Sequence, residues 1–172
     1  MNDERRAFAV KCYHAALAAC GEPWRARWMA AIACHESGWG RYVPKESNNP
    51  IGYHWISGRG WPYVETTEGG TGRKQRYRKF ASLEECFTSL DYLIRESRIE
   101  GYAEAREHFA SCLEGIRKGW IVDFSLGFCP VDPGHGVSVA QIYTALEGIE
   151  DETPNADFAA GDDGVVERVH QA

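Results

Sequence analysis

The sequence of 172 residues lacks three features that would each indicate a class of protein. No apolar run approaches the length needed to cross a bilayer, so we expect a soluble protein without membrane insertion. The formal net charge of -6 argues against a nucleic-acid binder, whose affinity depends on a strong positive field. The six cysteines include no CxxC pair, and nothing signals the oxidising compartment that a disulfide framework needs. We therefore expect a monomer with buried free thiols and no metal or other cofactor.

The chain does contain several helical patterns and many aromatic residues. A period near 3.6 residues marks helices over 8–20, 24–36, 83–94, 109–116 and 139–149. Between residues 41 and 80 glycine, proline, asparagine and aromatic residues replace this period, which predicts an inserted lobe with a hairpin of Tyr63–Thr67 and Lys74–Phe80. Six Trp and eight Tyr can provide flat platforms on which sugar rings stack.

The stretch from Pro23 to Gly40 contains the first candidate catalytic residue. Steps of four residues follow one helical face and end on a carboxylate: Trp24, Trp28, Ile32 and Glu36. Pro23 suits a first turn, and Gly38 and Gly40 suit a helix end, so Glu36 should lie in the last turn. The negative end of the helix dipole and a wall of tryptophans would disfavour its ionisation. We therefore predict that Glu36 is the general acid for cleavage of a glycosidic bond, rather than a solvated surface group.

A second carboxylate is needed because glycosidases generally flank the scissile bond with two. Glu68 shares a strand face with Val64 and Thr66 at the tip of the predicted hairpin, which makes it the natural partner of Glu36. Glu65 or Glu46 could serve instead. One carboxylate on a helix end and one on a hairpin would leave a cleft for a glycan between them.

Aromatic and amide side chains around this cleft are candidates for binding sugar. They are Trp39, Tyr42, Asn49, Tyr53, Trp55, Trp61 and Tyr63. Asn49 could hydrogen-bond sugar or N-acetyl groups, and some of the aromatic residues must form the core of the lobe. A basic cluster on the hairpin could contact substrate carboxylates or protect an exposed strand edge: Arg73, Lys74, Arg76, Arg78 and Lys79.

Several motifs together resemble glycoside hydrolase family 73, the peptidoglycan-cleaving N-acetylglucosaminidases that include the hydrolase domain of flagellar rod-cap proteins. They are Glu-Ser-Gly-Trp-Gly at 36–40, Asn-Asn-Pro-Ile-Gly at 48–52, Thr-Thr-Glu at 66–68 and Tyr-Arg-Lys-Phe-Ala-Ser at 77–82. The resemblance spans roughly residues 28–146. It implies a mainly α, lysozyme-like domain over 1–150, with a small β-hairpin lobe at about 41–80 and a flexible acidic tail at 151–172.

The sequence departs from that family in a late loop, Gly-Phe-Cys-Pro-Val-Asp-Pro at 127–133. This loop is similar to the family's Gly-Tyr-x-Thr-Asp-Pro loop, which lies over the cleft and supplies a catalytic tyrosine. The resemblance places Phe128, in the position of the tyrosine, and Asp132 at the substrate site. His135 could replace the missing hydroxyl, although a loop histidine is more often only solvated.

The resemblance implies hydrolysis of the N-acetylglucosaminyl-β-1,4-N-acetylmuramic acid linkage of peptidoglycan. Glu36 would donate the proton, and Glu68 would stabilise the oxocarbenium-like centre or activate water. Two alternatives remain: a muramidase or lytic transglycosylase of the same fold, and a catalytically inactive glycan-binding or structural module, which Phe128 motivates.

The first 20 residues contain neither the continuous apolar segment nor the cleavage site of a signal peptide. We therefore expect synthesis in the cytoplasm. Action on the cell wall would then follow release by a phage-type route, as for a bacteriolytic endolysin, or export by a secretion apparatus.

Overall fold

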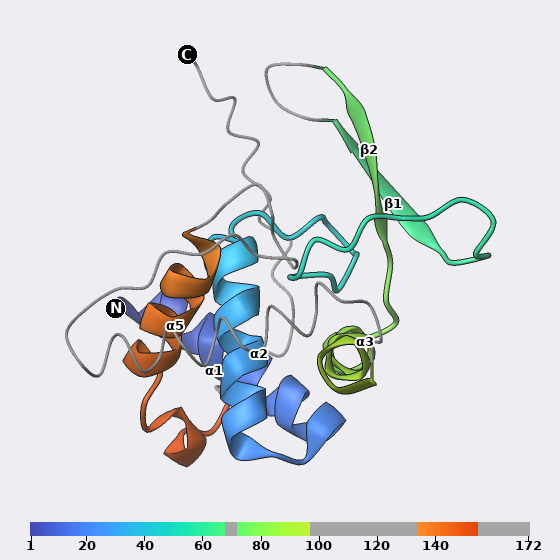
Figure 1. Ribbon diagram of the computed structural model, residues 1–172. Coiled ribbons are helices and arrows are strands. Elements are labelled where there is room, and N and C mark those ends of the chain that lie inside the picture. Colours follow the sequence, from blue (N-terminus) through green and yellow to red (C-terminus); the bar gives the residue numbers. More distant parts are fainter. Residues whose placement is uncertain (68–71, 97–133, 155–172) are drawn as a thin grey trace.

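A computed structural model of the chain describes residues 1–67, 72–96 and 134–154. The elements in this part are α1 (Asp3–Cys20), α2 (Pro23–Glu36), β1 (Tyr63–Thr67), β2 (Lys74–Arg78), α3 (Leu83–Glu96), α5 (His135–Ala145) and the 3₁₀ helix η1 (Ile149–Asp151). The helices gather in one body, and the two-stranded antiparallel sheet projects away from it (Figure 1). The predicted mainly helical fold with a small hairpin lobe is confirmed.

Capping interactions set both ends of helix α1. The side chain of Asn2 accepts a hydrogen bond from the backbone N–H of Arg5 at 3.0 Å, and Asp3 and Glu4 lie in the positive first turn. Gly21, at φ 70°, ends the helix in the left-handed conformation that favours glycine. The predicted glycine stop is confirmed, whereas the helix begins at Asp3, five residues before the predicted start.

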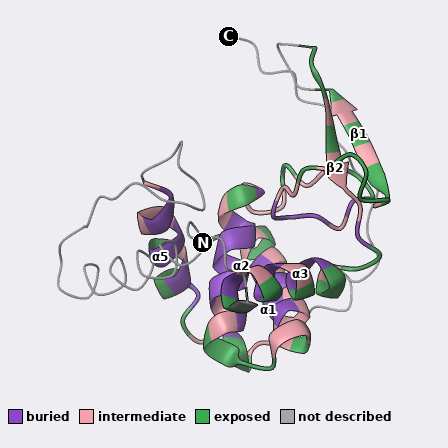
Figure 2. Ribbon diagram, turned by 45° about the vertical axis from the view of Figure 1, so that its right-hand side comes forward, coloured by how far each residue is buried: buried purple, intermediate pink, exposed green. Residues whose placement is uncertain are grey.

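Helix α2 is the central helix of the body. It packs against α1 and α5, and its residues from 28 to 34 are buried (Figure 2). Neighbours on several sides fix both its direction and the position of its last residue, Glu36. Pro23 lies in the first turn, as the sequence predicts.

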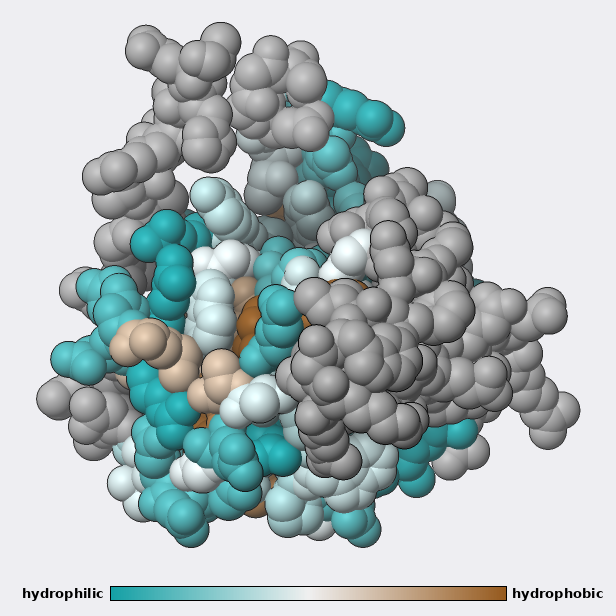
Figure 3. Space-filling model, turned by 60° about the vertical axis from the view of Figure 1, so that its left-hand side comes forward, coloured by the Kyte–Doolittle hydropathy of each residue, from teal (hydrophilic) through white to brown (hydrophobic). Residues whose placement is uncertain are grey.

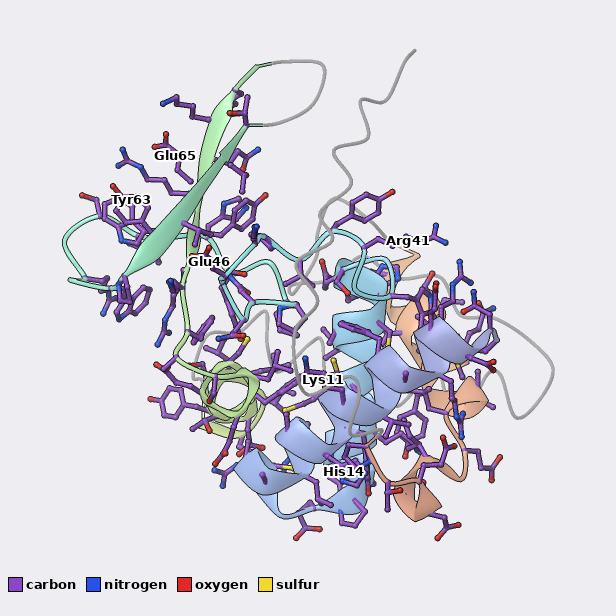
Figure 4. All side chains as sticks on the ribbon, turned by 180° about the vertical axis from the view of Figure 1, so that it is seen from behind. Lys11, His14, Arg41, Glu46, Tyr63 and Glu65 are labelled. Atoms are coloured by element: carbon purple, nitrogen blue, oxygen red, sulfur yellow. The ribbon has the colours of Figure 1, made fainter. Side chains whose placement is uncertain are left out.

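The hairpin pairs Tyr63 with Arg78 at its base and Thr67 with Lys74 towards its tip. The second strand is two residues shorter than predicted, because Phe80 is buried in the helical core instead. Glu65 lies opposite Arg76 and on the outer side of the hairpin (Figure 4). Cross-strand charge pairs of this kind stabilise a sheet with little hydrophobic core of its own.

The loop at 47–53 attaches the hairpin to the helical body. Phe80 donates its backbone N–H to the carbonyl of Ser47 at 2.8 Å, and Asn48 Nδ2 donates to the carbonyls of Phe80 and Ala81 at 3.0 and 3.2 Å. Helix α3 follows directly with the predicted capping box: Glu85 donates its N–H to Ser82 Oγ at 3.1 Å. The exit of the hairpin is therefore fixed on both sides.

Buried thiols contribute to the packing of the helices. Cys12, Cys34 and Cys86 are buried and free, and Cys20 is a partly buried free thiol. Burial raises the pKa of Cys34 and of Cys86 from 9.0 to about 12. The prediction of buried free thiols is confirmed for those three, whereas Cys112 and Cys129 lie outside the described residues.

The start of the predicted tail is packed against α1. Asp151 ends η1, and Glu152 forms an ion pair with Arg6 and accepts a hydrogen bond from His14 at its carbonyl. The expected helix at 109–116 and the remainder of the tail lie outside the described residues. Within the described part, no helix combines the length and apolar character that a bilayer crossing needs.

Candidate active site

Glu36 is the last residue of α2, and a tight turn leads the chain away from it. Gly38, Trp39 and Gly40 follow with φ of 57°, 64° and 87°, three consecutive residues in the left-handed region. Ser37 holds this turn: its Oγ donates to the carbonyl of Ala33 at 2.6 Å and accepts the N–H of Gly40 at 2.8 Å. The Glu-Ser-Gly-Trp-Gly motif is thus a helix stop that fixes the position of Glu36.

The carboxylate of Glu36 meets a histidine that is distant in sequence. Its Oε1 lies 2.6 Å from Nε2 of His135, the first residue of α5. The His135 side chain is 6% exposed and that of Glu36 is 28% exposed, so the pair reaches solvent through the carboxylate. The expectation that His135 is merely solvated is wrong. The sequence did contain a sign that His135 is buried: it lies four residues before Val139, on the apolar face of the predicted helix.

A second imidazole completes the cluster. The rings of His35 and His135 are 4.7 Å apart between centroids and nearly perpendicular, at 86°. One ligand atom from each of His35, Glu36 and His135 lies within 4.8 Å of the other two. The end of α2 and the start of α5 therefore bring one carboxylate and two imidazoles close together.

The expected wall of tryptophans does not surround Glu36. Trp24 and Trp28 stack on each other in the first half of α2, at 6.4 Å between ring centroids. Trp28 is eight residues before Glu36, which at the rise of an α-helix is about 12 Å along the axis. Of the predicted stripe, Trp28 and Ile32 are buried, whereas Trp24 is 51% exposed. The stripe runs along the helix axis and therefore cannot enclose the residue at its end.

The aromatic candidates lie in two places. Trp55, Trp61 and Tyr63 form a cluster in the hairpin lobe, where Trp55 Nε1 donates to the carbonyl of Trp61 at 2.9 Å. The guanidinium groups of Arg76 and Arg78 cover these rings, at 4.8 Å from Tyr63 and 4.3 Å from Trp61. Trp55 and Trp61 are only partly buried and Tyr63 is 43% exposed, so these rings pack on one another at the surface of the lobe.

Two other aromatic candidates lie just after Glu36 in sequence. Trp39 is partly buried, with the Arg5 guanidinium 5.7 Å from its ring, and packs against the helical core. Tyr42 is 65% exposed and is the candidate most accessible to a ligand. Of the predicted sugar-stacking residues, these two come from the turn that positions Glu36.

Asn49 has a structural role instead of the predicted sugar contact. It is 1% exposed, and its Nδ2 donates to the carbonyls of Tyr53 and Arg78, both at 2.9 Å. Its Oδ1 accepts the N–H of Tyr53, also at 2.9 Å. The ring of Tyr53 packs against Phe80. Asn49 and Tyr53 therefore join the loop to the hairpin. The sequence motif alone did not distinguish this role from sugar binding, because a buried amide can hydrogen-bond the backbone as well as a ligand.

Two of the alternative second carboxylates are engaged elsewhere. Glu65 is bound by Lys74 at 2.8 Å and by Arg76 at 3.1 Å, and hydrogen bonds from these two residues lower its pKa. Glu46 lies 3.8 Å from Lys79, with its side chain 70% exposed. These pairs also account for much of the basic cluster as internal partners of acidic groups. Glu68, Phe128 and Asp132 lie outside the described residues.

A carboxylate at the end of the central helix, in a mainly helical body with a hairpin lobe, is the arrangement expected of a glycosidase with a lysozyme-like fold. The chain belongs to the glucosaminidase family, described as mannosyl-glycoprotein endo-beta-N-acetylglucosaminidase, whose profile matches residues 13–146. The predicted resemblance to glycoside hydrolase family 73 is confirmed, and the chain is a glycoside hydrolase of the N-acetylglucosaminidase class.

Solved structures share the fold at low sequence identity. A peptidoglycan hydrolase from Sphingomonas sp. A1 is 20% identical with a TM-score of 0.61, over 94% of this chain and 99% of that chain. The glycoside hydrolase domain of FlgJ from Salmonella typhimurium is 19% identical with a TM-score of 0.61, over 88% and 92% of the two chains. No curated protein gives a significant match. The lysozyme-like architecture expected from the sequence is confirmed.

Proposed function

We propose that the chain hydrolyses the N-acetylglucosaminyl-β-1,4-N-acetylmuramic acid linkage of peptidoglycan, with Glu36 as the general acid. The observation that carries the proposal is the 2.6 Å contact between Glu36 Oε1 and His135 Nε2 at the end of a rigid helix. Family membership supports the N-acetylglucosaminyl specificity. Relatives of the same fold that are described as peptidoglycan hydrolases support the choice of polymer.

The geometry suits proton donation. An N–H of His135 that donates to Oε1 leaves the proton of a neutral Glu36 carboxyl on Oε2, where it can reach the leaving oxygen of a bound glycan. After transfer the carboxylate keeps the hydrogen bond from His135, which stabilises its new negative charge. Burial of the imidazole fixes this orientation before substrate binds, so little reorganisation is needed during the reaction.

Glu68 remains our proposed second carboxylate, which stabilises the oxocarbenium-like centre or activates water. The support comes from the Thr-Thr-Glu motif at 66–68 and from the engagement of Glu65 and Glu46 with lysine and arginine. Substrate assistance by the N-acetyl group is the other route known for glycosidases. The digestion experiment below is designed to identify the linkage first.

The test is digestion of purified peptidoglycan by the wild type and by Glu36→Gln, with reduced products analysed by mass spectrometry. Reducing-end N-acetylglucosamine from the wild type, and turnover lower by about 10²- to 10⁴-fold in the variant, is the expected result. Glu84→Gln, an exposed glutamate on α3, is the matched control and should keep full activity. Full activity of a folded Glu36→Gln variant would refute the assignment of the acid. Reducing-end N-acetylmuramic acid or an anhydro product would instead indicate a muramidase or a lytic transglycosylase.

We also propose that the enzyme acts as a monomer. On the described part of the face in Figure 3, hydrophilic side chains predominate, and hydrophobic atoms show only in small areas near the centre. Large exposed apolar side chains are dispersed over several elements: Trp24, Tyr42, Ile56, Tyr63 and Tyr92. Light scattering coupled to size exclusion should give the mass of one chain, and a stable dimer would contradict the proposal.

A further inference from the structure

The three residues at the junction of α2 and α5 form a candidate metal site. In the described ranges, the single group of three or more ligand-type residues with mutually close ligand atoms is His35, Glu36 and His135. A hydrolytic acid needs one carboxyl and one orienting partner, so the second imidazole has no part in the proposed reaction. Two imidazoles beside one carboxylate are also the ligand types of a metal site.

The types of ligand atom in this cluster favour Zn²⁺ over Mg²⁺ and Ca²⁺. Two imidazole nitrogens and one carboxylate oxygen form a typical three-ligand set for Zn²⁺, with a fourth position left for water. Mg²⁺ and Ca²⁺ prefer sites made mainly of oxygen. The side chain of Glu36 is 28% exposed, so solvent can supply the remaining ligand and an ion can enter from that side.

Coordination of a metal requires the ligand atoms, which lie within 4.8 Å of one another, to move to the spacing of a coordination shell. Zn²⁺ bonds of about 2.0–2.1 Å in a tetrahedral arrangement separate neighbouring ligand atoms by about 3.3 Å. Glu36 Oε1 and His135 Nε2 are now 2.6 Å apart and joined by the N–H of His135, which a metal would replace as the two atoms separate. The rings of His35 and His135 are 4.7 Å apart between centroids, in an edge-to-face contact, so rotation of these side chains would direct one nitrogen of each towards the ion.

We propose that His35, Glu36 and His135 bind one Zn²⁺ ion, with water as the fourth ligand, and that this ion reversibly inhibits the enzyme. The inhibition rests on the proposed function, because it requires Glu36 to be the acid. Binding converts the carboxyl into a carboxylate ligand, and its Oε2 proton leaves to solvent. Nε2 of His135 gives up its proton as the metal takes its place, and Nδ1 takes up a proton from solvent, so the imidazole stays neutral. Glu36 then has no proton to donate to a glycosidic oxygen until the ion leaves.

The experiment measures metal binding directly. Chelator-treated protein in a phosphine reductant is titrated with Zn²⁺ by calorimetry, and with Co²⁺ by visible absorption, in wild type, His35→Ala and His135→Ala. His54→Ala is the matched control, because His54 stacks on Tyr77 in the hairpin lobe. Mg²⁺ serves as the negative control ion.

We expect one Zn²⁺ per chain, an affinity at least about tenfold lower in each ligand variant, and no change in His54→Ala. Because His135 is buried, Glu36→Gln provides a variant of similar shape that should also weaken binding if His135→Ala does not fold. The absence of saturable one-to-one binding, or binding that His35→Ala and Glu36→Gln leave unchanged, would overturn the proposal. A thiolate charge-transfer band with Co²⁺ would overturn it too, because it would place the ion on a cysteine.

Failure of this inference can be distinguished from failure of the proposed function. Digestion of peptidoglycan by chelator-treated protein that binds no Zn²⁺ would leave the function standing and remove the metal site. The opposite result is one-to-one Zn²⁺ binding that depends on the three residues, in a protein that releases no glycan product with or without chelator. It would leave the metal site standing and remove the proposed function. Activity that falls as the site fills, and that returns with chelator, supports both.

Discussion

The ring of Phe8 on α1 lies directly against the backbone of Gly40, in the turn that follows Glu36. A Cβ at Gly40 would be only 2.6 Å from Cδ2 of that ring, a distance that real Cβ contacts do not show. Gly40 also has φ of 87°, which other residues rarely adopt. Glycine is therefore required at this position by both its conformation and its neighbour, and α1 helps to position the catalytic turn.

We predict that Gly40→Ala destabilises the protein by about 2–4 kcal/mol, the sum of backbone strain and overpacking. For a chain of this length, that corresponds to a fall in Tm of roughly 4–15 °C, measured by thermal unfolding. Gly52→Ala is the control for backbone strain alone, because Gly52 has φ of 74° but no atom within 4 Å of its added Cβ. Equal losses in the two variants would show that the Phe8 contact has no energetic consequence.

A substitution of Asn49 can distinguish a structural role of this residue from a role in binding sugar. We predict that Asn49→Ala lowers the free energy of unfolding by about 2–4 kcal/mol, because three partly buried backbone groups lose their partner. Asn48→Ala, which removes two hydrogen bonds nearer the surface, should cost less. Denaturant unfolding gives both values. A variant at Asn49 with unchanged stability and a raised KM would restore the sugar contact predicted from the sequence.

The sequence predicted the helix of Glu36 well because its signals are local. Pro23 at the start, buried residues at helical spacing and glycines at the end depend only on backbone conformation and on one buried face. The role of Asn49 was not predictable in this way. Its partners include the carbonyl of Arg78, 29 positions away, and a motif does not reveal whether an amide serves the chain or a ligand.

The contact between Glu36 and His135 spans 99 positions, so no local pattern contains it. The sequence did offer His135 as a candidate, but it assigned the residue to a solvated loop. The first residue of a helix can be buried when a neighbouring helix covers it, and α2 packs against α5. Tertiary packing thus decided the role of this residue.

Buried thiols should make stability fall in alkaline solution. Their pKa values are raised in the folded state, so their contribution is complete below the ordinary value of 9.0 and is lost as the pH rises towards about 12. Above pH 9 the unfolded chain ionises first, and each thiol then favours unfolding by about 1.4 kcal/mol per pH unit.

The matched measurement uses Cys34→Ala under reducing conditions at pH 8 and pH 10. At pH 8 the variant loses packing and is less stable than the wild type. At pH 10 the wild type alone bears the ionisation penalty at this position, so the difference between the two proteins should shrink by about 1.4 kcal/mol. An identical difference at both pH values in urea unfolding would show that this thiol does not titrate differently on folding.

The assignment of the second carboxylate predicts unequal effects of two hairpin substitutions. Glu65→Gln removes ion pairs to Lys74 and Arg76 on the outer side of the hairpin and should leave turnover within about threefold of the wild type. Glu68→Gln should lower turnover by about 10²-fold or more. Rates of glycan release, normalised to folded protein, provide the comparison. The reverse order would move the role to Glu65.

The hydrogen bond to Glu36 predicts a kinetic effect for His135 that differs from simple loss of stability. In chelator-treated buffer, His135→Ala should lower kcat by about 10- to 100-fold, the usual value of a hydrogen bond to a charged group, with little change in KM. His135→Gln keeps an N–H donor and should recover part of that loss. His54→Ala should have wild-type kinetics, and circular dichroism should establish the folded fraction of each variant. If His135 only filled space, Gln and Ala would differ in stability but not in kcat per folded molecule, because the orientation of the Glu36 carboxyl would then depend on α2 alone.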